Sequence, residues 1–293
     1  MKKAIFIYNP LSGARFVVSK IGYVFEKFQK SNILIQPYIL NASKQNELME
    51  LMQKESYDFA IVAGGDGSVS FVANILMKSG QNIPLGIIPA GTCNDFAKCI
   101  NIPLKFEENL EVILNGNEKQ VDIGLLNGER YFLNSYAGGV FADVSFKTDN
   151  EFKKNLGAFA YYIKALSEVK NIKSFQLNIK MPRREINLDA ILFFITNGKS
   201  IAGFPNMVKK ANLTDGMMNI AVIKRCSNID LVSLFFKVLN GTWDKDSNVV
   251  FIEAKECFIS ANKDIQITVD GEKGEPLPAV IKFVNKGIKV FVK

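Results

Sequence analysis

The sequence predicts an α/β amino-terminal domain with a parallel sheet, followed by an antiparallel β-sandwich domain. In roughly the first third of the 293 residues, short apolar runs alternate with segments whose apolar residues recur at helical spacing. Such alternation is typical of a parallel sheet with helices on both faces. Beyond about residue 124, strand-like segments dominate, which favours an antiparallel sandwich. We expect one domain over residues 1–124 and another over residues 125–283, packed together with a cleft between them.

The strands expected in the first domain are short apolar runs bounded by turn residues, at 4–8, 33–40, 59–63 and 84–88. Between them, apolar residues recur three or four positions apart, which predicts helices at 17–28, 44–54, 69–76 and 94–99. Pro37 cannot donate a hydrogen bond to a neighbouring strand. The strand that contains it is therefore expected at an edge of the sheet.

The second domain is expected to be built mainly from strands. Strand-like segments separated by turn residues cover 130–134, 175–180, 187–196, 218–223, 249–252, 257–260, 265–269, 279–283 and 288–292. Helical spacing predicts two helices among them, at 155–169 and 229–239.

The chain contains no histidine, which excludes an imidazole base, a histidine-ligated metal and a Ser-His-Asp triad. A general base in this chain is therefore a carboxylate, Lys, Tyr or Cys. The formal net charge is +7 and the isoelectric point is about 9.0, which favours anionic partners such as nucleotide phosphates or an acidic membrane surface. Because the positive charge is not concentrated in one stripe, we expect no nucleic-acid partner.

The four cysteines form neither a Cys-x-x-Cys pair nor a zinc-ligand spacing, and the first residues show no signal-peptide pattern. We therefore expect a reducing, cytoplasmic environment. No run of about 18 apolar residues occurs, so no membrane-spanning helix is expected.

The strongest local signal is the loop Gly64-Gly65-Asp66-Gly67-Ser68, between an expected buried strand and an expected amphipathic helix. Its three glycines allow a ligand to approach the backbone closely. The following helix offers free N–H groups and the positive end of its dipole to a phosphate. Asp66 would then orient a loop N–H or reach a metal-bound water. A tight turn with Asp66 as a helix cap explains the same residues, so this loop alone indicates only a phosphate site.

A second loop, at residues 89–97, also follows a strand and opens a helix. In it, Thr92 can donate to a phosphate, while Asn94 and Asp95 can cap the helix or hold ordered water and metal. The loop at residues 9–13 is expected at the same carboxyl edge of the parallel sheet, where ligands bind. Three polar loops meeting at one edge are hard to explain by turn chemistry alone.

Together with a late Asp270-Gly271-Glu272, these two glycine-bearing segments resemble the diacylglycerol kinase catalytic-domain family, most closely its soluble bacterial lipid kinases. The resemblance covers nearly the whole chain in the expected order. It implies a nucleotide-binding first domain like that of NAD kinases and phosphofructokinases, and a lipid-binding β-sandwich. It also implies that the last strand, at about residues 284–293, returns to the first domain.

The resemblance implies that ATP is bound by the three loops. The residues implied are Asn9, Pro10, Leu11, Ser12, Gly13, Asn41, Gly64, Gly65, Asp66, Gly67, Ser68, Val69, Ser70, Thr92 and Asn94. Two positions depart from the family pattern. Ser68 stands where the family usually has threonine, and Asn41 stands where a nucleotide-contacting threonine is common.

The resemblance also implies the catalytic and metal-binding residues. Glu272 matches the family's proton acceptor, and Asp66, Asp95 and Asp122 match acidic positions that hold Mg²⁺ through water near the phosphates. A structural magnesium site maps onto Asn212, Asp215 and Met217, with one carboxylate and two backbone carbonyls as ligands. Read from the residues alone, however, the segment 270–272 is also a hairpin turn and the segment 214–216 an ordinary turn.

The implied function is an ATP- and Mg²⁺-dependent lipid kinase of phospholipid metabolism. It would transfer the γ-phosphoryl group of ATP to the hydroxyl of diacylglycerol or a similar lipid alcohol, giving phosphatidic acid or an analogue. The lipid would require transient contact with the anionic inner face of the membrane, and the resemblance leaves room for a homodimer. The basic pairs Lys153-Lys154, Arg183-Arg184 and Lys209-Lys210 would suit such a surface, although solvated surface positions are the commoner explanation of such pairs.

Two other functions share parts of this pattern. NAD kinases and sugar kinases such as phosphofructokinases use the same Gly-Gly-Asp-Gly element, but the segment 89–97 and the late Glu272 favour the lipid branch. A non-catalytic module that senses nucleotide or lipid would keep the fold without turnover. The presence of Glu272 together with Asp66, Asp95 and Asp122 argues against such a module.

Overall fold

The computed structural model describes residues 1–140, 173–204 and 206–293. The chain forms two compact units: unit 1 is Met1–Ile123 with Asn285–Lys293, and unit 2 is Gly124–Val284. It passes between them within two strands, β5 (Asn117–Leu126) and β15 (Ala279–Val292). The parallel pairing in unit 1 and the antiparallel pairing in unit 2 confirm the two predicted fold classes.

Unit 1 is built on a parallel sheet in the order β4-β3-β1-β2. Its strands are β1 (Lys2–Tyr8), β2 (Ile33–Ile39), β3 (Phe59–Gly64) and β4 (Leu85–Pro89). The helices are η1 (Ser12–Arg15), α1 (Phe16–Lys30), η2 (Ala42–Lys44), α2 (Gln45–Lys54), α3 (Asp66–Ser79), α4 (Asp95–Cys99) and α5 (Phe106–Asn115). As Pro37 predicts, β2 lies at the edge of the sheet.

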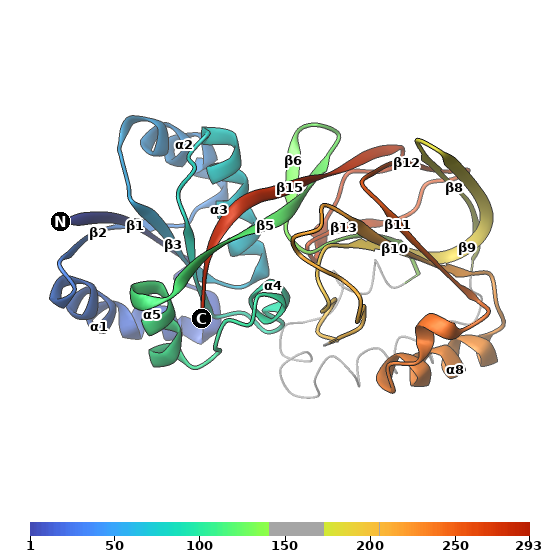
Figure 1. The fold of residues 1–293 in the computed structure, drawn as a ribbon, viewed down its shortest axis with the longest axis horizontal. Helices are drawn as coiled ribbons and strands as arrows, with labels where there is room; N and C mark the ends of the chain where they lie inside the picture. Colours follow the sequence, from blue (N-terminus) through green and yellow to red (C-terminus); the bar gives the residue numbers. More distant parts are fainter. Residues whose placement is uncertain (141–172, 205) are drawn as a thin grey trace. The chain divides into compact units, whose positions relative to one another are not determined.

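Helices cover both faces of this sheet, which is why its central strands are apolar along their whole length. Every residue of β3 is buried, and its side chains alternate between the two faces. Apolar residues of α1 and α5 pack with Phe6 and Ile61 on one face, and α2 and α3 lie together on the other (Figure 1). The last strand also joins this sheet, because Val290 of β15 pairs in parallel with Leu85 of β4.

Unit 2 is an antiparallel β-sandwich with one long helix among its described residues. Its elements are β6 (Arg130–Phe132), β7 (Ser135–Gly139), β8 (Phe175–Met181), β9 (Arg184–Thr196), β10 (Met218–Lys224), α8 (Asn228–Leu239), η3 (Trp243–Lys245), β11 (Val249–Ala254), β12 (Glu256–Ala261), β13 (Ile267–Val269) and β14 (Glu272–Lys273). Within the residues that the structure describes, no helix is long and apolar enough to cross a membrane.

Alternate residues of β9 belong to two different apolar cores. Phe193 packs inside the sandwich with Tyr136 and other buried side chains. Its neighbour Phe194 points to the other face and packs with Trp243 and with Leu234 of α8. The twofold periodicity of a strand requires this division, since successive side chains lie on opposite faces.

Several predicted elements differ from the observed ones. The segments 279–283 and 288–292, predicted as two strands, are one continuous strand, β15, in which Lys286 has a positive φ of 52°. The segment 130–134, predicted as one strand, is a strand only over Arg130–Phe132 (β6); residues 133–134 form a bend, and β7 begins at Ser135. Helix α5 and strands β5 and β7 were not predicted, and the helix predicted at 155–169 lies outside the described residues.

The division between β6 and β7 has a physical cause, which is the Asp270 carboxylate. It accepts hydrogen bonds from the backbone N–H groups of Leu133 (2.8 Å), Asn134 (2.8 Å) and Ser135 (2.9 Å). A side chain therefore takes the donors that a continuous strand would have offered to its neighbour. Asp270 and Gly271 both have positive φ, 50° and 83°, and form the two-residue turn between β13 and β14. Such a turn matches the twist of a hairpin.

We predict that Asp270→Asn destabilises unit 2. Asparagine tolerates the left-handed backbone, so the change removes the charge and one acceptor oxygen without adding strain. The free energy of unfolding should fall by roughly 1–3 kcal/mol, because hydrogen bonds to an ionised group are lost. Trp243, the only tryptophan of the chain and buried in unit 2, reports urea denaturation by its fluorescence.

The matched control is Asp264→Asn, which changes an exposed aspartate of the same unit. The midpoint of urea denaturation of this variant should equal that of the wild type. An Asp270→Asn protein as stable as the control would show that the three N–H contacts do not hold the hairpin in place.

Candidate functional site

Three loops meet at the carboxyl edge of the unit 1 sheet. Hydrogen bonds continue the strand pairing into them: Asn9 N–H donates to the Ala63 carbonyl (3.0 Å), and Ala90 N–H donates to the Gly64 carbonyl (2.8 Å). A Cβ atom added to Gly13 would lie 3.3 Å from the Ala90 carbonyl oxygen. The loops at residues 9–13, 64–68 and 89–94 therefore lie against one another.

The closest approach is between the backbones of Gly65 and Gly91. A Cβ atom added to Gly91 would lie only 2.6 Å from the Gly65 Cα atom. A Cβ atom added to Gly64 would lie 2.5 Å from the Ser68 side chain and 3.5 Å from Ser12 Oγ. Side chains are excluded at these positions, so the glycines are required for loop packing as well as for access to a ligand.

Asn94 closes the second loop. Its Nδ2 donates to the Gly91 carbonyl oxygen (2.8 Å), and its Oδ1 accepts from Gly91 N–H (2.8 Å). The residue has a φ of 50° and makes no side-chain cap to α4, so the expectation that Asn94 caps this helix is wrong. Held in this way, the loop presents Thr92, which is exposed.

Asp66 connects the first glycine loop to the second. It lies in the first turn of α3, and its Oδ1 accepts a hydrogen bond from Phe96 N–H at 3.4 Å. The N–H group that it binds belongs to the first turn of α4 rather than to a loop, and both predicted roles of Asp66 stay predictions. Asp95, which precedes Phe96 in sequence, is buried, with 6% of its surface exposed. The amino terminus of the 14-residue helix α3 directs N–H groups and a positive dipole end toward the space beside these loops.

Asp122 and Asn41 have structural partners. Asp122 is completely buried, and its Oδ1 accepts from Lys286 N–H at 2.7 Å, which fastens β15 to β5. Asn41 follows β2 and is exposed; its Oδ1 accepts from Ser43 N–H (3.0 Å) and Ser43 Oγ (2.8 Å) and caps η2.

Glu272 lies in unit 2, directly after the turn between β13 and β14. Its side chain is 60% exposed, and Oε2 lies 3.7 Å from Arg130 Nη2. Arg130 also forms an ion pair with Glu275 (3.3 Å) and donates to the Lys273 carbonyl (3.5 Å). The segment 270–272 is therefore a hairpin turn, and the turn presents an exposed carboxylate. The hairpin-turn interpretation of this motif is therefore observed, and the role of Glu272 as proton acceptor stays a prediction.

Other candidate bases of unit 2 are poorly suited to proton transfer. Burial, with a smaller effect of Glu275 and Cys257, holds the pKa of Tyr136 far above its ordinary value. Burial also raises the pKa of the Cys257 thiol to about 12. Both groups stay protonated at neutral pH, and both lie inside the sandwich core.

The segment Asn212 to Met217 forms two consecutive side-chain turns in unit 2. Asn212 Oδ1 accepts from Thr214 N–H (3.2 Å) and Thr214 Oγ1 (2.9 Å), and Asp215 Oδ1 accepts from Met217 N–H (2.9 Å). Within residues 1–140, 173–204 and 206–293, no three acidic or thiol side chains are grouped as metal ligands. One carboxylate with backbone carbonyls still suits Mg²⁺, which keeps several of its waters.

The predicted site residues thus lie in both units, and Asn41 and Asp122 belong to unit 1. Residues 9–13, 64–70 and 91–95 lie together in unit 1, whereas Glu272 and the segment 212–217 lie in unit 2. Sequence reasoning missed Arg130, the partner of Glu272, and no local pattern marks it. It placed Asp270 in a hairpin turn but missed the hydrogen bonds that its carboxylate accepts from the backbone of residues 133–135.

Comparisons with known proteins match both parts of the chain. A family model described as the diacylglycerol kinase catalytic domain matches residues 3–126, and one described as the YegS C-terminal NAD kinase beta sandwich-like domain matches residues 135–292. Proteins named diacylglycerol kinase from Staphylococcus aureus strains JH9 and Newman are each 34% identical over 291 residues, covering 99% of this chain and 92% of theirs.

Solved structures share the fold. A putative diacylglycerol kinase from Bacillus anthracis str. Sterne has a TM-score of 0.86 at 24% identity, covering 100% of this chain and 95% of that chain. A second structure of a putative diacylglycerol kinase from the same organism has a TM-score of 0.84 at 24% identity. The match covers 100% of this chain and 97% of that chain.

We predict that Gly91→Ala destabilises unit 1 by about 1–3 kcal/mol. The new methyl group would overlap Gly65 Cα and Asn94 Oδ1, at 2.6 and 2.9 Å, so the loops would have to separate. Urea denaturation followed by far-ultraviolet circular dichroism measures the loss.

Gly22→Ala is the matched control, because nothing lies within 4 Å of its added Cβ and it is inside α1. It should raise the free energy of unfolding by roughly 0.5–1 kcal/mol. If both variants shift stability in the same direction, the loops are not packed as tightly as described.

Proposed function

We propose, from the premise that this chain belongs to the diacylglycerol kinase catalytic-domain family, that it transfers the γ-phosphoryl group of ATP to the hydroxyl of diacylglycerol or a similar lipid alcohol. The product is phosphatidic acid or an analogue. The observation that carries the proposal is the contact of three polar, glycine-bearing loops at the amino terminus of α3. Phosphoryl transfer asks a protein mainly to position its reactants and to neutralise charge, and these loops are suited to both tasks.

The nucleotide phosphates are bound at residues 9–13 and 64–70, with Thr92 and Asn94 of the neighbouring loop. Backbone N–H groups of the glycine-rich segment and of the first turn of α3 can donate hydrogen bonds to phosphate oxygens. The contact of Gly65 with Gly91 keeps side chains out of this region, so that phosphate oxygens reach the backbone. Asn41 follows β2, the strand next to β1. Its side-chain oxygen caps η2, so it takes part in nucleotide binding through its remaining amide group.

Asp66 and Asp95 would hold Mg²⁺ through water, and the ion would neutralise charge on the phosphate oxygens. Their chemistry fits, because Mg²⁺ at such sites needs only one or two carboxylates in addition to substrate phosphates. Asp122 acts indirectly. Since its carboxylate holds the backbone of Lys286, it is a positioning residue for the last strand. The separate segment at Asn212, Asp215 and Met217 would hold a second, structural ion.

Glu272 accepts the proton of the lipid hydroxyl as that oxygen attacks the γ-phosphorus. Its exposure leaves the carboxylate accessible to a substrate, and the ion pair with Arg130 holds it in place. The bond between the hydroxyl oxygen and phosphorus forms while the bond from phosphorus to the bridging oxygen of ADP breaks. Glu272 belongs to unit 2, and the glycine loops belong to unit 1.

The lipid acceptor resides in a membrane, so turnover requires a peripheral encounter with its cytoplasmic face. The net charge of +7 favours an anionic surface at this step. The acceptor is identified by incubating the protein with labelled ATP, Mg²⁺ and, separately, diacylglycerol micelles, NAD⁺ and fructose 6-phosphate. We expect label in a chloroform-extractable product that depends on Mg²⁺. Label found only in NADP⁺ or a sugar bisphosphate would overturn the proposal.

We predict that Glu272→Gln lowers kcat for the lipid acceptor about 10²- to 10⁴-fold, the usual contribution of a general base. The amide keeps the size of the side chain but cannot take the proton. The KM for ATP should be nearly unchanged, because the nucleotide is bound by other residues. Steady-state kinetics in mixed micelles measures both quantities.

Glu275→Gln is the control, because Glu275 pairs with the same arginine and is also exposed. Its kcat should stay close to that of the wild type. Equal turnover of Glu272→Gln and the wild type would remove Glu272 from the mechanism, whereas equal losses in both variants would assign the effect to Arg130.

A further inference from the structure

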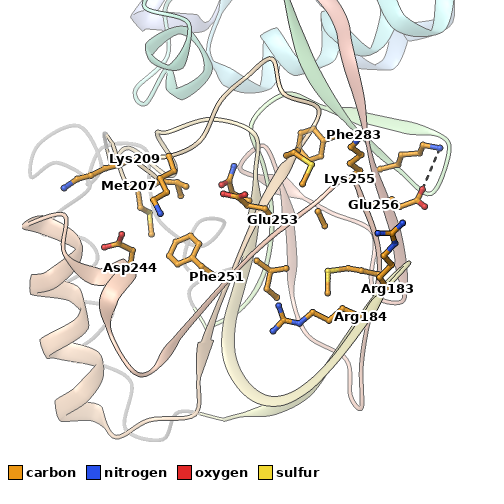
Figure 2. A pocket seen from close by; sticks show the side chains of 18 of the residues that line it. Arg183, Arg184, Met207, Lys209, Asp244, Phe251, Glu253, Lys255, Glu256 and Phe283 are labelled. Carbon is orange, nitrogen blue, oxygen red and sulfur yellow. Dashed lines mark ion pairs between the residues drawn. The ribbon is translucent and has the colours of Figure 1, made fainter.

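Unit 2 contains a pocket of about 1030 Å³ that the proposed reaction does not use. All of its lining residues belong to unit 2, and none comes from the hairpin that carries Glu272. Figure 2 shows Arg183 and Arg184 on one side of the pocket, Met207 and Lys209 on the opposite side, and Phe251 between them. Its volume is at the upper end of the range of small-molecule sites.

One part of the pocket lining is apolar and adaptable. Its apolar residues are three methionines and three aromatic residues, which are Met181, Met207, Met217, Trp243, Phe251 and Phe283. Met207, Trp243 and Phe251 form a wall that packs with the core containing Leu234 of α8, whereas Met181 and Phe283 pack with the sandwich core. The Trp243 and Phe251 rings lie 4.8 Å apart, and Trp243 Nε1 donates to the Met207 carbonyl at 2.8 Å, which fixes this wall. Methionine side chains adjust to irregular apolar ligands, so the wall suits a flexible hydrocarbon chain.

The other part of the lining is basic. Two pairs that stand out in the sequence, Arg183-Arg184 and Lys209-Lys210, both line this pocket although they are separated along the chain. Arg183 lies in the turn between β8 and β9, and Arg184 begins β9. Lys255 and Lys282 bring the basic side chains to six, against three acidic ones. This excess favours an anionic ligand.

Several of these basic groups lack an acidic partner. Lys282 pairs with Glu256 at 3.8 Å, and Lys209 Nζ donates to the Gly241 carbonyl at 2.8 Å. Among the residues placed by the structure, no carboxylate lies within 4.0 Å of Arg183, Arg184 or Lys255. The arginines in particular offer planar forks of donors, which bind carboxylate or phosphate oxygens in pairs.

We propose that this pocket binds a single-chain anionic amphiphile, with its acyl chain on the methionine and aromatic wall and its anionic head against Arg183 and Arg184. A neutral lipid would leave the arginines without a partner, and a free inorganic anion would leave the apolar wall unused. The shared chemistry is one hydrocarbon chain that ends in an anion. A fatty-acid carboxylate and a lysophospholipid phosphate both supply it.

Trp243 is the only tryptophan of the chain and lines the pocket, so its fluorescence reports occupancy. The full-length protein is titrated with oleate, oleoyl lysophosphatidate, monooleoylglycerol and inorganic phosphate. The three lipid probes are kept below the concentrations at which they aggregate. We expect a saturable change with at least one of the two anionic amphiphiles. Monooleoylglycerol and inorganic phosphate should bind at least tenfold more weakly, and the comparison of oleate with lysophosphatidate identifies the preferred head group.

The variant Arg183→Ser/Arg184→Ser tests the basic wall at two exposed positions, and Arg225→Ser is its control, an exposed arginine of unit 2 outside the pocket. Affinity for the anionic amphiphile should fall at least tenfold in the double variant and stay unchanged in the control, with both proteins melting as the wild type does. Calorimetric titration repeats each measurement without relying on Trp243.

Each of the following results would overturn the proposal. The first is equal affinity for monooleoylglycerol and the anionic probes, and the second is undiminished affinity in the double variant. The third is the absence of both a fluorescence change and heat of binding with every probe.

Discussion

The contact between the backbones of Gly65 and Gly91 is the constraint on which the candidate site depends. These residues follow neighbouring parallel strands, and the space between their Cα atoms does not admit a side chain. Asn94 fixes the shape of one loop, and Asp66 ties that loop to the start of α3. These contacts hold the two loops against each other, and a loop that is already held in place needs little reorganisation when a ligand binds.

Much of the fold could be predicted because its signals are local. The apolar run at 59–63 and the glycine loop after it predict β3 and the start of α3, since a strand buried on both faces and a phosphate-type turn each have a sequence pattern. The break between β6 and β7 could not be predicted. It is caused by Asp270, which lies 135 to 137 residues away along the chain. The positive φ of Lys286 within β15 likewise occurs where its N–H donates to Asp122, a residue distant in sequence.

The same distinction applies to the candidate site. The glycine loops and the Asp-Gly-Glu segment could be recognised because their residues are adjacent in sequence. The role of Asn94 was missed, because an asparagine before a helix resembles a cap whether its side chain points forward to the helix or, as here, back to Gly91. Arg130 beside Glu272, and the two basic pairs around one pocket, arise only from tertiary folding.

The central claim is that the glycine loops hold the phosphates of ATP while Glu272 takes the proton of the attacking hydroxyl. A crystal structure of the protein with Mg²⁺, a non-hydrolysable ATP analogue and a short-chain diacylglycerol tests it most directly. We expect phosphate oxygens against the backbone N–H groups of residues 64–68, and a Glu272 oxygen about 2.6–3.2 Å from the acceptor hydroxyl. An acceptor hydroxyl bound beside a different carboxylate, or a triphosphate bound away from these loops, would contradict the account.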